Sequence, residues 1–381
     1  MSVDATLTRA VMSCGLTSGL DAVGVAAVEP FASTRGDLER RKASGLHAGM
    51  AFTYRNPERS TSPGRILPGA ASLVVGARAY RRDAAPIPKA GGPRGRVARY
   101  AWTDTYAPLR DALAAVAAYL RNAGWTARVV VDDNALVDRE AAARAGLGWY
   151  GKNANLLLPG RGSWFVLGSV VTNAELEPAR ERQPDGCGSC RRCLDGCPTG
   201  AIVSPGVVDG RRCLAWLVQA PGVFPRAWRE ALGDRIYGCD DCQEVCPPNR
   251  LPRAGSGARD EGMAVRPWVD VLTWLAMGDD ALLAAAGRWY VPNRSPRYLR
   301  RNALLVLGNT GDGTDPTVLA AIDAALRHAD PIVRGHAVWA AARLGRPDLA
   351  LAWCSGDEDP DVRAELAALD DVAPNRRTSR Q

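Results

Sequence analysis

Apolar residues recur at two spacings along the first 180 positions, and together they predict a domain of helices and strands. Helical spacing covers Leu7–Leu16, Pro108–Leu120 and Ala135–Ala145. Four shorter apolar runs predict strands, over Gly19–Ala26, Ala71–Gly76, Arg128–Val131 and Ser163–Val171. We therefore expect residues 1–180 to form an α/β or α+β domain.

The C-terminal part of the chain is repetitive and helical. An Asp-Pro dipeptide begins at Asp315, Asp330 and Asp359, each time ahead of a run rich in alanine, leucine or valine. Aspartate at the N-cap and proline at the first helical position are strong helix starts. The pattern predicts an all-α domain of HEAT-like repeats over residues 266–381. Polar linkers at Glu175–Gln183 and Ala258–Pro267 leave residues 181–265 as a domain of their own.

Eight of the ten cysteines lie between Cys187 and Cys246. The first four are spaced C-x2-C-x2-C-x3-C and precede a proline, which is the ferredoxin run for four-iron clusters. The fourth cysteine of such a run ligates the neighbouring cluster. By this crossover we expect a ferredoxin-like domain with two [4Fe-4S] clusters. One is held by Cys187, Cys190, Cys193 and Cys246, and the other by Cys239, Cys242, Cys213 and Cys197.

Other uses of these cysteines fit their spacing less well. Two zinc sites would also need eight thiolates, but zinc ligands come as separated C-x2-C pairs. Disulfides need an oxidising compartment, and the N-terminus has neither a signal-peptide core nor a twin-arginine pair. No run of about 18 uncharged apolar residues occurs, so we predict no membrane span. We expect a cytoplasmic protein that does not bind membranes.

The segment Gly146-Leu-Gly-Trp-Tyr-Gly151 matches the glycine pattern of nucleotide-binding loops. Such a loop follows a strand and opens a helix, whereas this one follows a predicted helix. We therefore expect no nicotinamide site here. The glycines are interpreted as positions where the backbone closely approaches a flat ligand.

Two adjacent carboxylates, Asp132 and Asp133, follow the predicted strand Arg128–Val131. The carboxyl ends of strands in α/β sheets are where ligands bind. Mutual repulsion raises the pKa of one carboxyl of such a pair, which suits a proton donor. The other interpretation is that both side chains cap the helix that follows.

The net charge of +7 and the pI near 9.0 indicate an anionic partner. Arginines gather between Arg288 and Asn302, with three aromatic residues and no acid. Arginine binds phosphates and aromatic rings stack on unstacked bases, so this segment is a candidate RNA-binding surface. A second basic segment, Arg78–Arg99, reads as a Pro/Gly-rich loop that is either solvated or a partner contact. A solvated helix face is the alternative for the arginines.

Three blocks in this order resemble the epoxyqueuosine reductase family, and the resemblance spans nearly the whole chain. The blocks are Val131–Arg139 with Ala145–Asn153, then Cys187–Ile202 with Tyr237–Asn249, and finally Leu299–Asn309. The family is cobalamin-dependent and reduces epoxyqueuosine to queuosine in a tRNA anticodon loop. The resemblance implies electron transfer through both clusters to cobalamin, and an aspartate as proton donor.

The resemblance also indicates which residues of this sequence would donate the proton and which would contact cobalamin. The proton donor corresponds to Asp132, although the neighbouring Asp133 departs from the family pattern and leaves the choice open. Cobalamin contacts are expected at Asp132, Lys152, Leu157 and Asp240, without a histidine ligand to cobalt. From the arginine-rich segment described above, contacts with the tRNA anticodon stem-loop are expected at Arg294, Arg297, Tyr298, Arg300 and Arg301.

The expected partners are tRNA and a reduced electron donor such as a ferredoxin or flavodoxin, and we expect a monomer. Two alternatives remain at this stage. One is another corrinoid and iron–sulfur reductase of the reductive dehalogenase type. The other is a non-catalytic electron carrier with an RNA-binding module, which would leave the N-terminal domain without a purpose.

Overall fold

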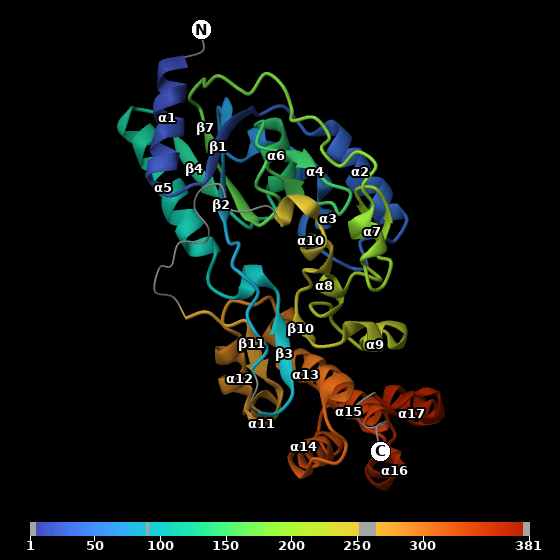
Figure 1. The fold of residues 1–381 in the computed structure, drawn as a ribbon. Coiled ribbons are helices and arrows are strands. Elements are labelled where there is room, and N and C mark those ends of the chain that lie inside the picture. The colour runs from blue at the N-terminus through green and yellow to red at the C-terminus, as the bar shows by residue number, and fades with distance from the viewer. Residues whose placement is uncertain (1–4, 89–90, 251–263, 376–381) are drawn as a thin grey trace. The chain divides into compact units, whose positions relative to one another are not determined.

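The computed structural model describes residues 5–88, 91–250 and 264–375 (Figure 1). The chain forms two compact units, each made of three segments. The first unit contains Met1–Asp83, Thr103–Cys213 and Asp240–Ala264, and the second contains Ala84–Trp102, Leu214–Cys239 and Val265–Gln381. These units cross the boundaries expected at 180 and 265, so most of the cysteine-rich segment packs with the N-terminal fold. The expected linker Ala258–Pro267 lies largely outside the described residues.

A four-stranded antiparallel sheet forms the centre of the first unit. Its strand order is β1-β2-β7-β4. All four predicted strands are present, as β1 (Ala22–Ala27), β2 (Ser72–Ala79), β4 (Ala127–Val130) and β7 (Phe165–Thr172). Because no pair in this sheet is parallel, the rule about carboxyl edges of parallel sheets does not apply to it.

Helices cover both faces of this sheet. Helices α1 (Ala5–Thr17) and α5 (Tyr106–Asn122) pack on one face, and α6 (Asp138–Arg144) packs on the other. Gly76 and Gly168 are paired across β2 and β7. A Cβ atom at either position would lie 3.1 or 2.7 Å from the Leu113 side chain of α5. The two glycines therefore form the recess that seats α5 on the sheet.

The rest of the first unit consists of short elements. The N-terminal segment adds three helices, α2 (Ala32–Ala43), α3 (Phe52–Arg55) and α4 (Pro57–Ser60). Two small hairpins pair β5 (Trp149–Tyr150) with β6 (Leu156–Leu157), and β8 (Ile202–Ser204) with β9 (Val207–Val208). The cysteine-rich segment contributes α7 (Arg192–Asp195) and α10 (Asp241–Glu244).

The second unit contains a small sheet that the sequence did not reveal. Strand β3 (Arg94–Val97) pairs in parallel with β10 (Arg235–Tyr237) and antiparallel with β11 (Trp268–Asp270). The interpretation of Arg78–Arg99 as one continuous loop is therefore wrong at both ends, because Arg78 and Ala79 belong to β2 and Arg94–Val97 form β3. The strand is only four residues long and contains a glycine and two arginines, so its sequence carries no apolar run.

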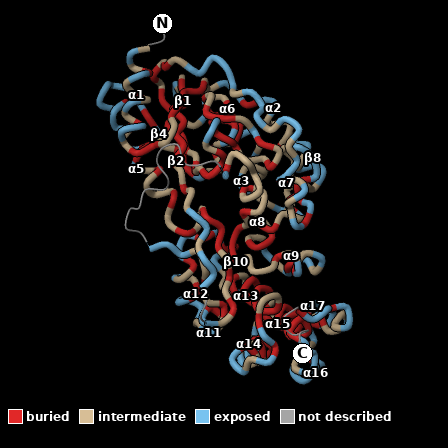
Figure 2. The backbone as a smooth tube through the Cα atoms, viewed as in Figure 1, coloured by how far each residue is buried: buried red, intermediate tan, exposed pale blue. Residues whose placement is uncertain are grey.

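Helices make up the remainder of the second unit. They are α8 (Leu214–Leu217), α9 (Arg229–Leu232), α11 (Val271–Ala276), α12 (Asp279–Ala286), α13 (Arg297–Thr310), α14 (Pro316–Leu326), α15 (Pro331–Arg343), α16 (Pro347–Cys354) and α17 (Pro360–Ala367). Helix α15 contacts α13, α14, α16 and α17. It is buried along most of its length (Figure 2), so it is the core of the repeats.

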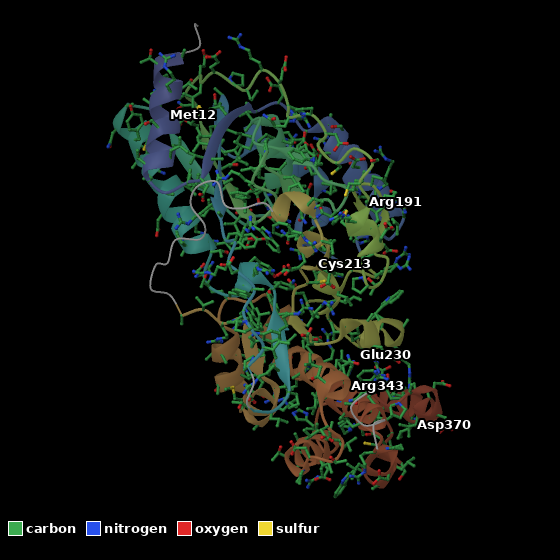
Figure 3. All side chains as sticks on the ribbon, in the orientation of Figure 1. Met12, Arg191, Cys213, Glu230, Arg343 and Asp370 are labelled. Atoms are coloured by element: carbon green, nitrogen blue, oxygen red, sulfur yellow. The ribbon has the colours of Figure 1, made fainter. Side chains whose placement is uncertain are left out.

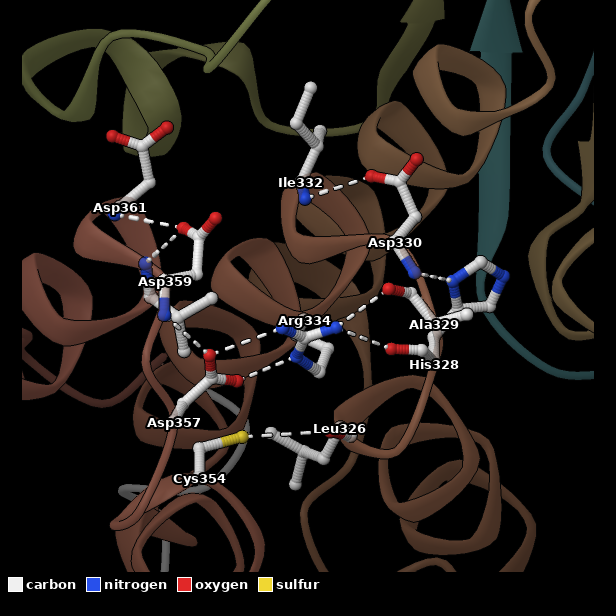
Figure 4. Close-up of polar contacts among 11 residues, drawn as sticks. Leu326, His328, Ala329, Asp330, Ile332, Arg334, Cys354, Asp357, Asp359 and Asp361 are labelled. Atoms are coloured by element: carbon white, nitrogen blue, oxygen red, sulfur yellow. Dashed lines mark hydrogen bonds and ion pairs between the residues drawn. The ribbon is translucent and has the colours of Figure 1, made fainter.

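The three Asp-Pro helix starts are confirmed. Asp315, Asp330 and Asp359 are N-caps, and their carboxylates accept backbone N–H bonds of 2.8–2.9 Å from Thr317, Ile332 and Asp361. Arg334 joins two of these helix starts, because it donates to the backbone carbonyls of His328 and Ala329 and to the carboxylate of Asp357 (Figure 4).

Two arginines of α13 are buried, which corrects the expectation that they contact tRNA. The Arg301 side chain has no exposed surface and donates to the carbonyls of Leu217, Val218, Ala220 and Gly222. Arg300 is 7% exposed and pairs with Asp279 at 2.6 Å. Arg301 instead fixes the segment after α8 to α13. The arginine-rich segment itself contains no acid, whereas Asp279 comes from α12.

We predict that Arg301→Met destabilises the second unit by about 3–5 kcal/mol, because four carbonyls, two of them in buried bonds, lose the guanidinium as a donor. The measurement is the urea midpoint of the protein carrying both clusters. Arg297→Met on the same helix is the control, since that side chain is exposed and its loss should cost under about 1 kcal/mol. Equal midpoints for the two variants would contradict the assignment of Arg301 as a structural residue.

Candidate functional site

Four cysteines from both ends of the cysteine-rich segment line one cavity of the first unit. The cavity has a volume of about 370 Å³ and is lined by Cys187, Cys190, Cys193 and Cys246. The two helices beside these cysteines approach closely, since a Cβ atom on Gly196 would lie 3.1 Å from the Val245 side chain. The structure thus brings together the four residues that the crossover assigned to one cluster.

The chemistry of this cavity fits an iron–sulfur cluster. Burial, and then the neighbouring Cys193, Cys187 and Cys190, raise the pKa of the Cys246 thiol to about 11. Four thiolates can therefore gather here only with compensating positive charge, which iron supplies. Trp149 also lines the cavity, and its indole Nε1–H is buried with no partner among the described residues. Such a donor can bind cluster sulfur.

The cysteines expected at the second cluster are only partly placed together. The Cys197 sulfur accepts the Ala201 N–H at 3.2 Å, and Thr199 donates to the Arg212 carbonyl at 2.6 Å, directly before Cys213. Cys213 and Arg191 are labelled in Figure 3. Cys242 belongs to the first unit as well, whereas Cys239 is the last residue of its segment in the second unit. The ligand set of this cluster therefore stays a prediction.

The glycine-rich block connects the N-terminal fold to the cysteine segment. It follows α6 and opens the β5–β6 hairpin, which confirms that it is not a nucleotide-binding loop. A Cβ atom on Gly148 would lie 2.1 Å from the Leu157 carbonyl, and one on Gly151 would lie 2.3 Å from the Leu157 side chain. The close approach expected from these glycines is therefore made to the chain's own hairpin.

Two residues expected to contact cobalamin, Lys152 and Leu157, line the cysteine cavity. The Lys152 ammonium donates to the carbonyls of Gly188 and Cys190, at 2.6 and 2.9 Å. The next residue, Asn153, donates to the Cys242 carbonyl at 3.3 Å. The block thus holds the first and the last part of the cysteine segment.

Asp132 stands in the loop between β4 and α6. It lies two positions after the end of β4, is exposed, and has a φ of +52°, a left-handed conformation that aspartate tolerates better than most residues. Ser60 holds the loop, because its hydroxyl donates to the Asn134 carbonyl at 2.5 Å and its carbonyl accepts the Val137 N–H at 3.0 Å. The contacts of Ser60 hold the backbone of the loop that carries Asp132.

The two neighbouring carboxyls differ from Asp132. Asp133 accepts the Ala135 N–H at 2.8 Å, so it forms the turn that shapes this loop. Asp138, in the first turn of α6, has a buried Oδ1 with no partner among the described residues. Burial, and then the charge of Asp132, raise the pKa of Asp138 well above its usual range. Sequence reasoning missed Asp138, because an acid in the first turn of a helix is an ordinary feature.

Asp240, also expected at cobalamin, is buried beside a polar network. Burial and then the Asp240 charge raise the pKa of Tyr80. Gln243 donates to the Tyr80 hydroxyl at 3.3 Å and to the Ser163 carbonyl at 3.1 Å. Of the four residues expected at cobalamin, two thus lie at the cysteine cavity, one in the Asp132 loop and one in this network. The described contacts do not gather them around one ligand.

The exposed part of the arginine-rich segment remains a candidate RNA surface. Arg288, Arg294 and Arg297 are exposed, as is Tyr290, whereas Tyr298 is half-buried. Arg294 donates to three backbone carbonyls, and Arg297 pairs with Asp330 at 3.1 Å. Asn293 and Arg294 have φ near +50°, so the turn before α13 is strained.

No helix in the described part of the chain has the length and apolar character that a membrane span requires. Residues 186–249 match a family described as a 4Fe-4S double cluster binding domain, and residues 291–370 match HEAT repeats. The chain therefore carries two four-iron clusters, and the expected ferredoxin-like and HEAT-like parts are confirmed. The zinc interpretation is not supported.

The chain is similar to epoxyqueuosine reductases along most of its length. That of Bacillus cereus is 33% identical over 349 residues, which cover 89% of each chain, and that of Listeria monocytogenes is 32% identical over 92% of this chain and 93% of the relative. A crystal structure of an epoxyqueuosine reductase with an epoxyqueuosine-modified tRNA stem loop matches with a TM-score of 0.87 and 29% identity, covering 96% of this chain and 98% of that one. By these relationships the chain belongs to the epoxyqueuosine reductase family.

Proposed function

We propose that this protein reduces epoxyqueuosine to queuosine in the anticodon loop of tRNA, the last step in making that modified base. One observation beyond family membership carries the proposal. The cysteine cavity unites Cys246 with three cysteines more than fifty positions earlier, as a two-cluster electron pathway requires.

The reaction needs electrons and protons in equal number. Removing the epoxide oxygen as water, with formation of the alkene, takes two electrons and two protons. Each cluster passes one electron at a time. The protein must therefore place a proton donor where the carbon–oxygen bonds break.

Asp132 suits the role of proton donor better than Asp133. It corresponds to the family's proton donor and is exposed, whereas the Asp133 carboxylate shapes the loop by accepting the Ala135 N–H. The protonated Asp132 carboxyl would give its proton to the departing oxygen and be reprotonated from solvent. The neighbouring Asp138 is the carboxyl whose pKa is raised, by burial and then by the Asp132 charge, so a second protonated acid lies close to Asp132.

Cobalamin and the two clusters are the cofactors that membership of this family gives the chain. Bound cobalamin supplies a low-valent metal centre for reduction of the epoxide. Asp132 and Asp240 remain the proposed contacts for it. Lys152 and Leu157 are less suitable, because they line the cysteine cavity and the Lys152 ammonium is engaged there.

The tRNA is proposed to contact the exposed residues before and at the start of α13. Arg288, Arg294 and Arg297 would bind phosphates, and Tyr290, which is 56% exposed, would stack on a base. We further propose that a reduced ferredoxin or flavodoxin supplies the electrons. We also propose that the protein acts in the cytoplasm as a monomer.

Asp132→Asn should lower queuosine formation by about 100-fold or more, because a side-chain amide is far too weak an acid to give a proton to the departing oxygen. The measurement is anaerobic turnover of epoxyqueuosine-containing tRNA, read by mass spectrometry. Asp133→Asn is the matched control and should keep most activity, because its amide oxygen still accepts the Ala135 N–H. The reverse ranking would assign the proton to Asp133.

Neutralising Arg288 and Arg297 together as glutamines should weaken tRNA binding several-fold. The slope of log affinity against log salt should fall by roughly 0.7–0.9 for each phosphate that the protein no longer neutralises. Fluorescence anisotropy of an anticodon stem-loop at several salt concentrations measures both effects. Arg363→Gln, at an exposed arginine of α17, is the control for net charge. An unchanged slope would indicate that these arginines belong to a solvated surface that does not bind tRNA.

Asp138 makes stability fall as pH rises. Its folded pKa is raised, so between the unfolded and folded values the folded protein keeps a proton that the unfolded chain has lost. Each pH unit in that interval costs about 1.4 kcal/mol. Asp138→Asn should therefore have a higher urea midpoint than the parent at about pH 8, and the gain should shrink towards about pH 5. A gain that does not depend on pH would contradict the buried, protonated carboxyl.

A further inference from the structure

Lys152 makes an unusual connection between the N-terminal fold and the cysteine cavity. Its ammonium donates to the carbonyls of Gly188 and Cys190, which belong to the loop carrying the first two cysteines. Its own carbonyl accepts the Gly206 N–H at 2.9 Å. Both ends of the residue are thus fixed, so the position of the charge varies little.

This charge is not neutralised by a carboxylate. Lys152 is half-buried, and it has no ion pair within the described residues. None of the described residues that line the cavity is acidic. Arg192 is the other cation on the cavity wall, but it is exposed, so water and salt screen it more strongly.

A fixed positive charge beside a cluster changes the energy of its reduction. When a [4Fe-4S] cluster accepts one electron, its charge becomes more negative by one, and no bond forms or breaks. A nearby ammonium stabilises the reduced state more than the oxidised state, and little reorganisation is needed because hydrogen bonds already hold it. The net charge and hydrogen bonds around a cluster are among the main determinants of its potential.

We propose that Lys152 raises the reduction potential of the cluster held by Cys187, Cys190, Cys193 and Cys246. Lys152 is then a tuning residue, which acts through charge and does not touch the substrate. This role rests on the proposed cluster assignment and differs from the cobalamin contact expected for Lys152. It also explains why a lysine follows the hairpin glycines, which place it against the cysteine loop.

The test is a redox titration of the anaerobically reconstituted full chain, followed by electron paramagnetic resonance with dithionite as reductant. In Lys152→Met the midpoint of one cluster should shift to lower potential, while the other cluster stays unchanged. Lys152→Arg should keep the parent value, and Arg192→Gln should shift the same cluster less than Lys152→Met. Turnover is not measured, so failure of the proposed reaction would leave this test intact.

Equal midpoints in the parent and in Lys152→Met would overturn the proposal. Loss of bound cobalamin in Lys152→Met, with both midpoints unchanged, would overturn it in favour of a cobalamin contact. If Lys152→Met binds only half of the parent's iron, Lys152→Gln decides, because its amide keeps a donor without the charge. A lowered midpoint in that variant supports charge tuning, and the parent value rejects it.

Discussion

The structure depends on one long-range convergence, in which the Cys246 thiol meets those of Cys187, Cys190 and Cys193 at one cavity. Neither segment can complete a four-iron site alone, since three cysteines of one run leave the fourth position open. Bringing the segments together costs chain entropy and concentrates four groups that repel when ionised. When the cluster is bound, iron offsets the repulsion between the thiolates. Contacts with the N-terminal fold hold the two cysteine segments in place.

The contacts that hold the cysteine segments come from the glycine-rich block between α6 and β6. Its glycines fold the β5–β6 hairpin tightly on itself, and Lys152 and Asn153 then bind backbone carbonyls of the cysteine segment. The Asp132 loop leads into α6, so the proposed proton donor and the cysteine cavity are positioned by consecutive parts of one chain segment. A short stretch of sequence thus links the two proposed sources of the reaction's protons and electrons.

Much of this organisation was predictable from local sequence. The strands of the first sheet, the Asp-Pro helix starts and the cysteine spacing each have a signal within about twenty residues, and all appear as expected. Strand β3 was missed because its residues carry no apolar alternation. Arg301 was misassigned because its partners, the carbonyls of Leu217 to Gly222, lie about eighty positions away. Asp138 gave no signal, since only its burial distinguishes it from a surface acid.

The most direct measurement of the convergence is the iron content and Mössbauer spectrum of anaerobically reconstituted Cys246→Ser, compared with Cys14→Ser. Cys14 lies outside the cysteine segment, so its replacement should leave both clusters as in the parent. The account predicts that Cys246→Ser loses or alters one [4Fe-4S] signal while the other stays unchanged. Two unaltered signals in Cys246→Ser would contradict the crossover and the electron pathway built on it.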